Sequence, residues 1–379
     1  MLYKNAKPVC WKNWKLKHSG NEAHVVVEVP LYSDAWIIGG PLKYGPYTII
    51  NSVPIHNHTN RYEWKASMIL RAELFIESRS KDMSKTDEEH YHGGWLYDEI
   101  AALLALTHGI RIEAGPVQRE FRIHGDPLGR ARTYSPSLLP RVLPSVDAPV
   151  IPSLFLDCTL MDTELITKFS LLSQDNAIKL VKSARMYQKA LYFSDASPEL
   201  SWILFVSAIE NAARDWASND GDSLELLKNS HSELIDVLDE YDASGVLAAK
   251  IASLLAPRMK LTKKFINFCL DFLPNSPSER PQYNKVNFER DKIKKDLDKI
   301  YNYRSKALHA GIPFPDPMCY PPYKLENGIY TEKPDGLAVS TKDAVWMSDD
   351  LPMHLHTFEY ITRGVLLNWW RSMLSDHRE

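Results

Sequence analysis

The sequence predicts an α+β domain over residues 1–155, followed by an all-helical domain over residues 156–379. Residues 23–155 contain short β-branched or aromatic runs separated by Pro and Gly turns, and such runs favour strands. From about residue 160 the apolar residues recur every three or four positions, which is typical of amphipathic helices. Between the two regions lies a proline cluster that predicts an extended linker, formed by Pro140, Pro144, Pro149 and Pro152.

Length and composition agree with two soluble domains. The 379 residues are 44% hydrophobic and 25% charged, which is enough apolar material for two cores. The net charge of -3 gives no global attraction to nucleic acid, so any polyanion site must be a local patch. The four cysteines form no CxxC pair and read as reduced thiols. With neither a signal peptide nor an apolar run of membrane length, we expect a cytoplasmic protein without a membrane segment.

The N-terminal domain is expected to combine strands with one clear helix. HVVVEV, AWII and YTII predict the first strands. The helix covers Trp95–Thr107 and ends at Gly109; strands at Ile110–Ile112 and Arg119–Ile123 follow. His124–Ala131 has the composition of a turn, and the GxxxxGK[ST] phosphate loop is absent throughout, so NTP hydrolysis is not expected. We expect this domain to sense a trigger ligand or protein, or to regulate access.

Helical periodicity organises the second domain. The first predicted helix has an apolar face formed by Ala177, Leu180, Val181, Ala184, Tyr187, Ala190 and Leu191. Ser197-Pro198-Glu199 predicts the start of a central helix that runs from Leu200 to Trp216, with Ser197 as the cap. An acidic helix at 222–241 and a helix pair at 243–273 are expected next. A Pro- and Tyr-rich insertion at 313–349 predicts a lid or wrap. The last helix has the apolar stripe Leu355, Phe358, Ile361, Val365 and Trp369.

The segment IYNYRSKALHAG at 300–311 places an arginine and a histidine near the end of a predicted helix. Ile293, Leu297, Ile300 and Leu308 form the apolar stripe of this helix, and Arg304 lies on the same stripe. Gly311 and Pro313 predict that the helix ends there, which puts His309 in the final turn. At about 100° per residue, His309 lies roughly 140° around the helix from Arg304.

Arg304 needs a partner because an unpaired guanidinium on an apolar stripe is costly. Glu210 is the other charge on such a stripe in this domain, in line with Ile203, Val206, Ala213 and Ala217. We therefore expect Glu210 to pair with Arg304, and a bidentate pair would hold the guanidinium rigid. The alternative is a structural salt bridge without chemistry.

The motif YRSKALHAG, with Arg304 and His309 separated by four residues, resembles the HEPN ribonuclease motif and is most similar to that of the Apea-like HEPN proteins of prokaryotic defence systems. The helix SWILFVSAIENAA is similar to the central helix of that family. The resemblance implies a HEPN-like helical bundle, a homodimer in which the two Arg/His pairs meet, and RNA cleavage without a metal or cofactor. It also implies a toxin or an anti-phage, abortive-infection effector.

Residue chemistry assigns roles within that hypothesis. Cleavage through the RNA 2′-hydroxyl requires proton transfer, which suits His309, and charge stabilisation on the phosphorane, which suits Arg304. Glu210 would orient Arg304. Further candidate substrate-binding residues are Asn211, Tyr303, Lys306, Lys260, Lys263 and Lys264, the last three from a basic cluster on the predicted helix pair.

Two other functions compete with the ribonuclease hypothesis. The first is a catalytically inactive HEPN-like module that binds a protein or nucleotide partner, with Arg304 and Glu210 purely structural. The second is a metal hydrolase that uses the His-x-His pairs His56/His58, His90/His92 and His354/His356. The first two pairs lie in loop-like sequence, and the third is expected on a helix with its members on opposite faces, so no metal site is predicted.

Overall fold

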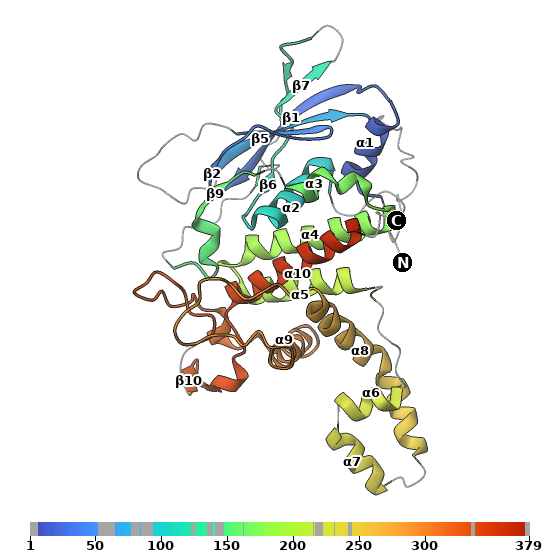
Figure 1. Cartoon of the computed structure of the whole chain (residues 1–379), viewed down its shortest axis with the longest axis vertical. Coiled ribbons are helices and arrows are strands. Elements are labelled where there is room, and N and C mark those ends of the chain that lie inside the picture. Colours follow the sequence, from blue (N-terminus) through green and yellow to red (C-terminus); the bar gives the residue numbers. More distant parts are fainter. Residues whose placement is uncertain are drawn as a thin grey trace.

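The computed structural model describes residues 7–51, 65–76, 84, 94–122, 126–134, 139–140, 148–161, 163–214, 216, 223–230, 232–241, 245–334 and 338–375. A sheet-rich N-terminal region precedes a largely helical C-terminal region, as the sequence predicts. In Figure 1 the sheet lies at the top of the molecule and the helices are layered beneath it. Within the described ranges, no helix is long and apolar enough to cross a membrane.

An antiparallel sheet dominates the N-terminal region. In spatial order its strands are β3 (Leu42–Tyr44), β4 (Tyr47–Asn51), β5 (Lys65–Leu74), β1 (Val25–Ser33), β7 (Arg119–Arg122) and β8 (Arg130–Ala131), and β6 (Glu113–Ala114) also pairs with β1. In the central pair, Val27 lies opposite Ala72 and Val29 opposite Leu70, and all four are buried. Alternate residues of a strand point to opposite faces, so this register turns one face of the sheet to the core.

Three helices lie under the buried face of the sheet, namely α1 (Val9–His18), α2 (Leu96–His108) and α3 (Glu164–Thr167) (Figure 1). Helix α2 matches the predicted Trp95–Thr107 helix and ends at Gly109, whose φ of 68° is left-handed. The buried Glu99 carboxylate on α2 accepts hydrogen bonds from the backbone N–H groups of Val9 (3.0 Å) and Cys10 (2.6 Å), which stabilises the start of α1.

The next layer contains α4 (Gln174–Phe193), α5 (Pro198–Ala213) and α10 (Leu355–Ser375), with α9 (Arg290–Ala310) and α8 (Val246–Asp271) below them (Figure 1). The predicted apolar stripes of α4 and α10 are buried throughout. Buried residues of the sheet and of these helices belong to one continuous core, which includes Val27, Leu103, Ala184, Phe205 and Trp370.

Helices α6 (Ser223–Ser230) and α7 (Ser232–Tyr241) pack on the first part of α8 and project with it from the rest of the molecule (Figure 1). We call α6, α7 and this part of α8 the arm. It has a small core of its own, formed by Leu227, Ile235, Leu238, Ala248 and Ala252.

Several sequence predictions of local structure are wrong. The expected acidic helix at 222–241 is divided into α6 and α7, and the expected helix pair at 243–273 is the single helix α8. Ile110–Ile112 is buried but not a strand, because the pairing with β1 begins only at β6. Ser197 precedes α5 as predicted, yet its side chain makes no cap hydrogen bond.

Two further short sheets complete the structure. Strand β2 (Trp36–Ile38) pairs in parallel with β9 (Asp157–Thr159), so the chain just after the predicted linker returns to the sheet region. The Pro- and Tyr-rich insertion contains a hairpin of β10 (Ala338–Thr341) and β11 (Ala344–Met347).

The buried Arg111 ties the sheet to the helical layer. Its guanidinium donates to Asp34 just after β1 at 2.6 Å, to Ser194 Oγ at 2.7 Å and to Asp195, and its Nε donates to the Leu191 carbonyl at 2.7 Å. Arg111 is only 2% exposed. Charges this deeply buried are tolerated only with such full pairing.

Replacing Arg111 with Leu should destabilise the whole protein, because Asp34 and Asp195 would remain buried without their cation. We expect a loss of about 3–5 kcal/mol in the free energy of unfolding, measured by urea denaturation. The matched control is Arg130→Leu, which removes the exposed pair with Asp126 and should cost less than about 1 kcal/mol. Equal losses in the two variants would contradict this role of Arg111.

Candidate active site

The expected contact between Arg304 and Glu210 is present. Arg304 on α9 donates from Nη2 to Glu210 Oε2 on α5. The second carboxylate oxygen, Oε1, accepts a hydrogen bond of 2.8 Å from the hydroxyl of Tyr301, one turn before Arg304 on the same face of α9. The guanidinium also lies 5.7 Å from the centre of the Tyr301 ring. The Glu210 carboxylate on α5 therefore holds two side chains of α9, the helix that carries the YRSKALHAG motif.

The Arg304–Glu210 pair is not bidentate, and Tyr301 donates to the second carboxylate oxygen. Arg304 contacts the carboxylate through one nitrogen, and its buried Nε has no hydrogen-bond partner among the described residues. The Arg304 and Glu210 side chains keep 17% and 20% of their surface exposed. The guanidinium is thus held at one edge and is still accessible to solvent.

Tyr301 was not among the candidate site residues of the sequence analysis. Its position three residues before Arg304 places the two side chains on one helix face, and this spacing is the signal that could have identified it. Burial and the adjacent negative charge of Glu210 raise the pKa of the Tyr301 hydroxyl, so it stays a hydrogen-bond donor at neutral pH.

His309 lies in the last turn of α9, as predicted, and is exposed. Gly311 ends the helix with a left-handed φ of 67°. The helix is regular through Ala310, so His309 lies about 7.5 Å further along the axis than Arg304 and roughly 140° around it. One copy of α9 therefore does not bring the two side chains together.

The apolar stripe of α9 ends earlier than the sequence predicts. Ile293, Leu297 and Ile300 are buried, whereas Leu308 is 48% exposed. The last buried position is Ser305, and residues 308–313 are all exposed. The end of α9 thus projects beyond the core, and Leu308 and Ile312 present apolar surface beside His309.

Tyr303 anchors the chain that follows the insertion. Its hydroxyl donates to the Asp350 carbonyl at 2.8 Å, and its ring packs edge-on against Phe314 at 6.1 Å. Burial, with a smaller contribution from Asp350, raises the pKa of Tyr303 to about 12. Lys306 is exposed and places Nζ 5.9 Å from the centre of the Tyr303 ring. The chain around 313–350 therefore contacts the motif helix, as a wrap should.

Two of the other candidate substrate-binding residues, Asn211 and Lys264, have structural contacts. Asn211 is buried and donates to the Lys179 carbonyl at 3.0 Å and to Ser183 Oγ at 2.8 Å, so it joins α5 to α4. Lys264 donates to the Arg214 carbonyl at 3.2 Å, at the end of α5. Lys263 is half-buried, and the side chain of Lys260 lies outside the described residues. The contacts of Asn211 and Lys264 therefore join α5 to its neighbouring helices α4 and α8.

The His-x-His pairs His56/His58 and His90/His92 lie outside the described residues. The expectation for His354/His356 is wrong, since His354 precedes α10 and the two rings stack with centroids 6.0 Å apart. His356 Nε2 lies 2.7 Å from the Thr331 carbonyl. In the part of the chain that the structure describes, no group of three or more His, Cys, Asp or Glu residues could hold a metal ion.

Comparison of the chain with models of protein families, with curated proteins and with solved structures found no match.

His354 should make stability depend on pH. Burial, reinforced by His356, lowers the pKa of His354 to about 3, below the value near 6.5 of an unfolded histidine. The unfolded chain therefore binds a proton that the folded one excludes, and stability falls as pH drops below 6.5. Between pH 7.5 and 5.5 the loss from His354 alone should be roughly 1.4 kcal/mol.

Urea denaturation at these two pH values checks this, with His354→Leu as the variant that removes the titrating group. Between pH 7.5 and 5.5 the free energy of unfolding should fall less in the variant than in the wild type, by roughly 1.4 kcal/mol. His24→Leu, at an exposed histidine, is the matched control and should keep the wild-type dependence. Identical pH profiles for His354→Leu and the wild type would overturn the assignment.

Proposed function

We propose that this protein is a metal-independent endoribonuclease of the HEPN type. One observation carries the proposal: Arg304 is held by Glu210 on the neighbouring helix, five residues before an exposed His309 in the last turn of α9. A salt bridge alone would serve a scaffold. An exposed imidazole at the end of the same helix adds a group that can transfer a proton near neutral pH.

The proposed chemistry divides the work between the two side chains. His309 takes the proton from the RNA 2′-hydroxyl, whose oxygen attacks the adjacent phosphorus and displaces the 5′-oxygen of the next nucleotide. The displaced oxygen takes up a proton from solvent, and His309 then returns its own proton to solvent. Arg304 stabilises the negative charge that develops on the phosphorane oxygens. Glu210 and Tyr301 are positioning residues, because they limit the rotation of the guanidinium. The products are a 2′,3′-cyclic phosphate and a 5′-hydroxyl, and no metal is required.

A homodimer is part of the proposal, because Arg304 and His309 diverge on one helix. Two copies that cross at the ends of their α9 helices would bring His309 of one near Arg304 of the other. Leu308 and Ile312 support this arrangement, since they are 48% and 51% exposed beside His309 and would be covered in such a dimer.

The biological setting we propose is that of a cytoplasmic toxin or anti-phage effector in which a trigger ligand or protein acts on the sheet region. Arg111 offers a physical route for such control, because it bonds Asp34 after β1 and Asp195 at the start of the turn into α5, the helix that carries Glu210.

The second candidate is an inactive HEPN-like module that binds a protein or nucleotide. The internal contacts of Asn211 and Tyr303 favour it, because they show side chains near the motif used for packing. The two candidates differ in what they require of His309, since cleavage needs its imidazole and a structural salt bridge between Arg304 and Glu210 does not.

His309→Ala should lower the rate of RNA cleavage by roughly two to four orders of magnitude, because it removes proton transfer. Its melting temperature should not change, since His309 is exposed. Arg304→Ala should lose cleavage equally and should also destabilise the fold, because Glu210 loses its cation. The loss in the free energy of unfolding should be limited to about 1–3 kcal/mol, since Glu210 still accepts the hydrogen bond from Tyr301. Cleavage of labelled RNA in EDTA, with analysis of the new ends, measures the first effect and urea denaturation the second.

The control for the histidine is His24→Ala, which removes another exposed imidazole and should cleave at the wild-type rate. Full activity in His309→Ala would overturn the proposal. Activity that vanishes with chelator and returns with zinc would do so as well, and would point to the His-x-His pairs.

The dimer should depend on the apolar end of α9. Leu308→Glu together with Ile312→Glu should convert a dimer at micromolar concentration into a monomer, because the four new carboxylates, two from each copy, would be buried, unpaired and mutually repelling. Sedimentation velocity gives the mass, and the same samples are assayed for cleavage, which should fall with dimer content. Leu254→Glu, at a 73% exposed leucine of the arm, is the control. A wild-type protein that is monomeric and still cuts RNA would contradict the dimer.

A further inference from the structure

Four lysines follow the exposed side of α9 in a regular pattern. Two further residues, Asn302 and His309, belong to the same pattern. The spacing alternates between three and four residues through positions Lys292, Lys295, Lys299, Asn302, Lys306 and His309. At about 100° per residue this spacing keeps all six on one side of the helix, opposite the buried stripe of Ile293, Leu297 and Ile300. We call these six positions the lysine stripe.

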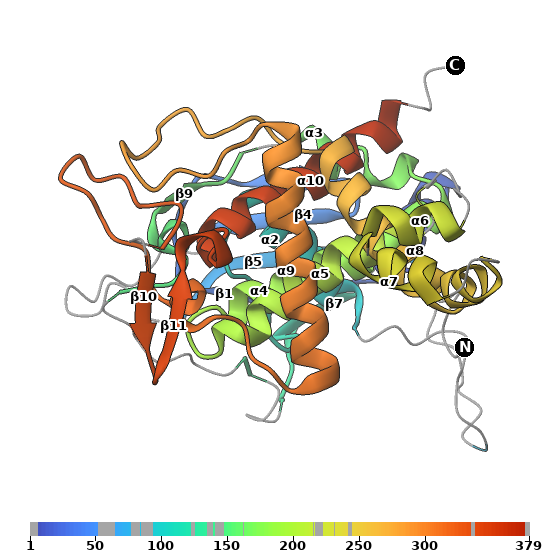
Figure 2. The same ribbon diagram turned by 90° about the horizontal axis from the view of Figure 1, so that it is seen from below.

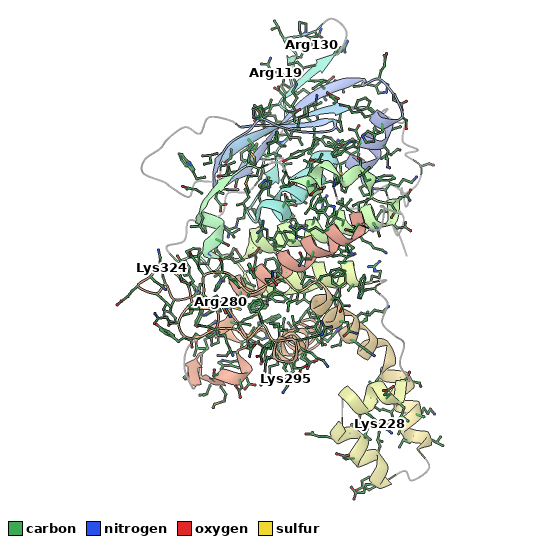
Figure 3. All side chains as sticks on the ribbon, in the orientation of Figure 1. Arg119, Arg130, Lys228, Arg280, Lys295 and Lys324 are labelled. Atoms are coloured by element: carbon green, nitrogen blue, oxygen red, sulfur yellow. The ribbon has the colours of Figure 1, made fainter. Side chains whose placement is uncertain are left out.

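The lysine stripe faces solvent. Figure 2 shows α9 running across the near side of the molecule, with no helix or strand drawn in front of it. Figure 3 places Lys295 on the lower side of α9, directed away from the helices above. Lys292, Lys295, Asn302, Lys306 and His309 are exposed, and Lys299 is half-buried.

The charges along the stripe are only partly neutralised. In the described part of the chain, Lys292 and Lys295 take part in none of the salt bridges, and Lys299 donates to the backbone carbonyl of Asp349. Asp291 and Asp298 lie along one edge, and Asp298 accepts a hydrogen bond from Asn302 at 3.3 Å. Asp296 is half-buried and interacts electrostatically with Lys333 and with Lys299 of the stripe. The stripe therefore keeps its positive charge at Lys292, Lys295 and Lys306, although the chain as a whole carries a net charge of -3.

We propose that the lysine stripe is the track along which the backbone of single-stranded RNA approaches His309. The inference rests on the proposed function. The stripe extends for about 25 Å along the axis, with lysines roughly 4.5–6 Å apart where they are consecutive. A single line of point charges on a convex helix matches one phosphate backbone, and lysines bind phosphates without reading bases. Binding is therefore tolerant of sequence and sensitive to salt.

The track and the proposed dimer use different parts of α9. The apolar residue Leu308 lies in the last turn of the helix and Ile312 lies just after its end, whereas the lysines extend back from His309 toward the start of the helix. In a dimer that crosses at the helix ends, the two stripes lead away from the paired sites in opposite directions. The RNA on either side of the cleaved bond then lies on a stripe of its own.

The test measures RNA binding in the His309→Ala background, so that the probe is not cut. Anisotropy of a fluorescein-labelled oligouridine of about 20 nucleotides gives the affinity over a salt series. Lys292→Gln with Lys295→Gln should reduce the slope of log affinity against log salt by about 1.4, because each phosphate contact on a single strand contributes about 0.7. Affinity near physiological salt should fall roughly tenfold.

The matched control is Lys294→Gln with Lys250→Gln, which removes the same charge from exposed positions off the stripe, Lys294 on α9 and Lys250 on α8. This control should keep the slope of the His309→Ala protein, and both sets of substitutions should leave its melting temperature unchanged. An unchanged slope in the stripe variant, or an equal reduction in the control, would overturn the track while wild-type cleavage still supports the ribonuclease. If His309→Ala does not bind the oligouridine and the wild type does not cleave RNA, both proposals are overturned.

Discussion

The buried guanidinium of Arg111 is the interaction on which the relation between sheet and helices depends. It is bonded to Asp34 at the end of β1 and to Ser194, Asp195 and Leu191 at the end of α4. Because these partners come from both regions of the chain, the guanidinium is satisfied only when sheet and helices are packed together. The continuous core has the same consequence, since its buried residues come from β1, α2, α4 and α10 without interruption.

The candidate site is built on the far side of that core, where charge is tolerated at the surface of the helical layer. Glu210 there serves two donors on α9, and each of its oxygens has one of them. A carboxylate shared in this way keeps Tyr301 and Arg304 in a fixed relation. Only one nitrogen of the guanidinium bonds the carboxylate. In a bidentate pair, two nitrogens would be used for the pairing.

Local sequence patterns predicted those parts of the fold that depend on periodicity. The stripes of α4 and α10, the end of α2 at Gly109 and the end of α9 at Gly311 follow from hydrophobic spacing and glycine chemistry. Pairing Glu210 with Arg304 was also predictable, because two charges on apolar stripes each need a partner.

The features that sequence reasoning missed depend on tertiary contacts. Leu308 continues the apolar spacing of α9, yet no element covers the last turn and the side chain is exposed. Arg111 gives no local signal, since its partners lie more than 75 residues away in sequence. The regular spacing of the lysines on α9 is present in the sequence, but only the structure shows that this side of the helix is uncovered.

Helix α8 connects the arm rigidly to the rest of the molecule. The helix is continuous from Val246 to Asp271, so its first turns belong to the small core of the arm and its last turns to the main core. A loop at this junction would act as a joint and leave the arm free to swivel. An unbroken helix of about 39 Å acts as a lever. A displacement of the arm would therefore tilt or rotate the last turns of α8, which pack beside α9.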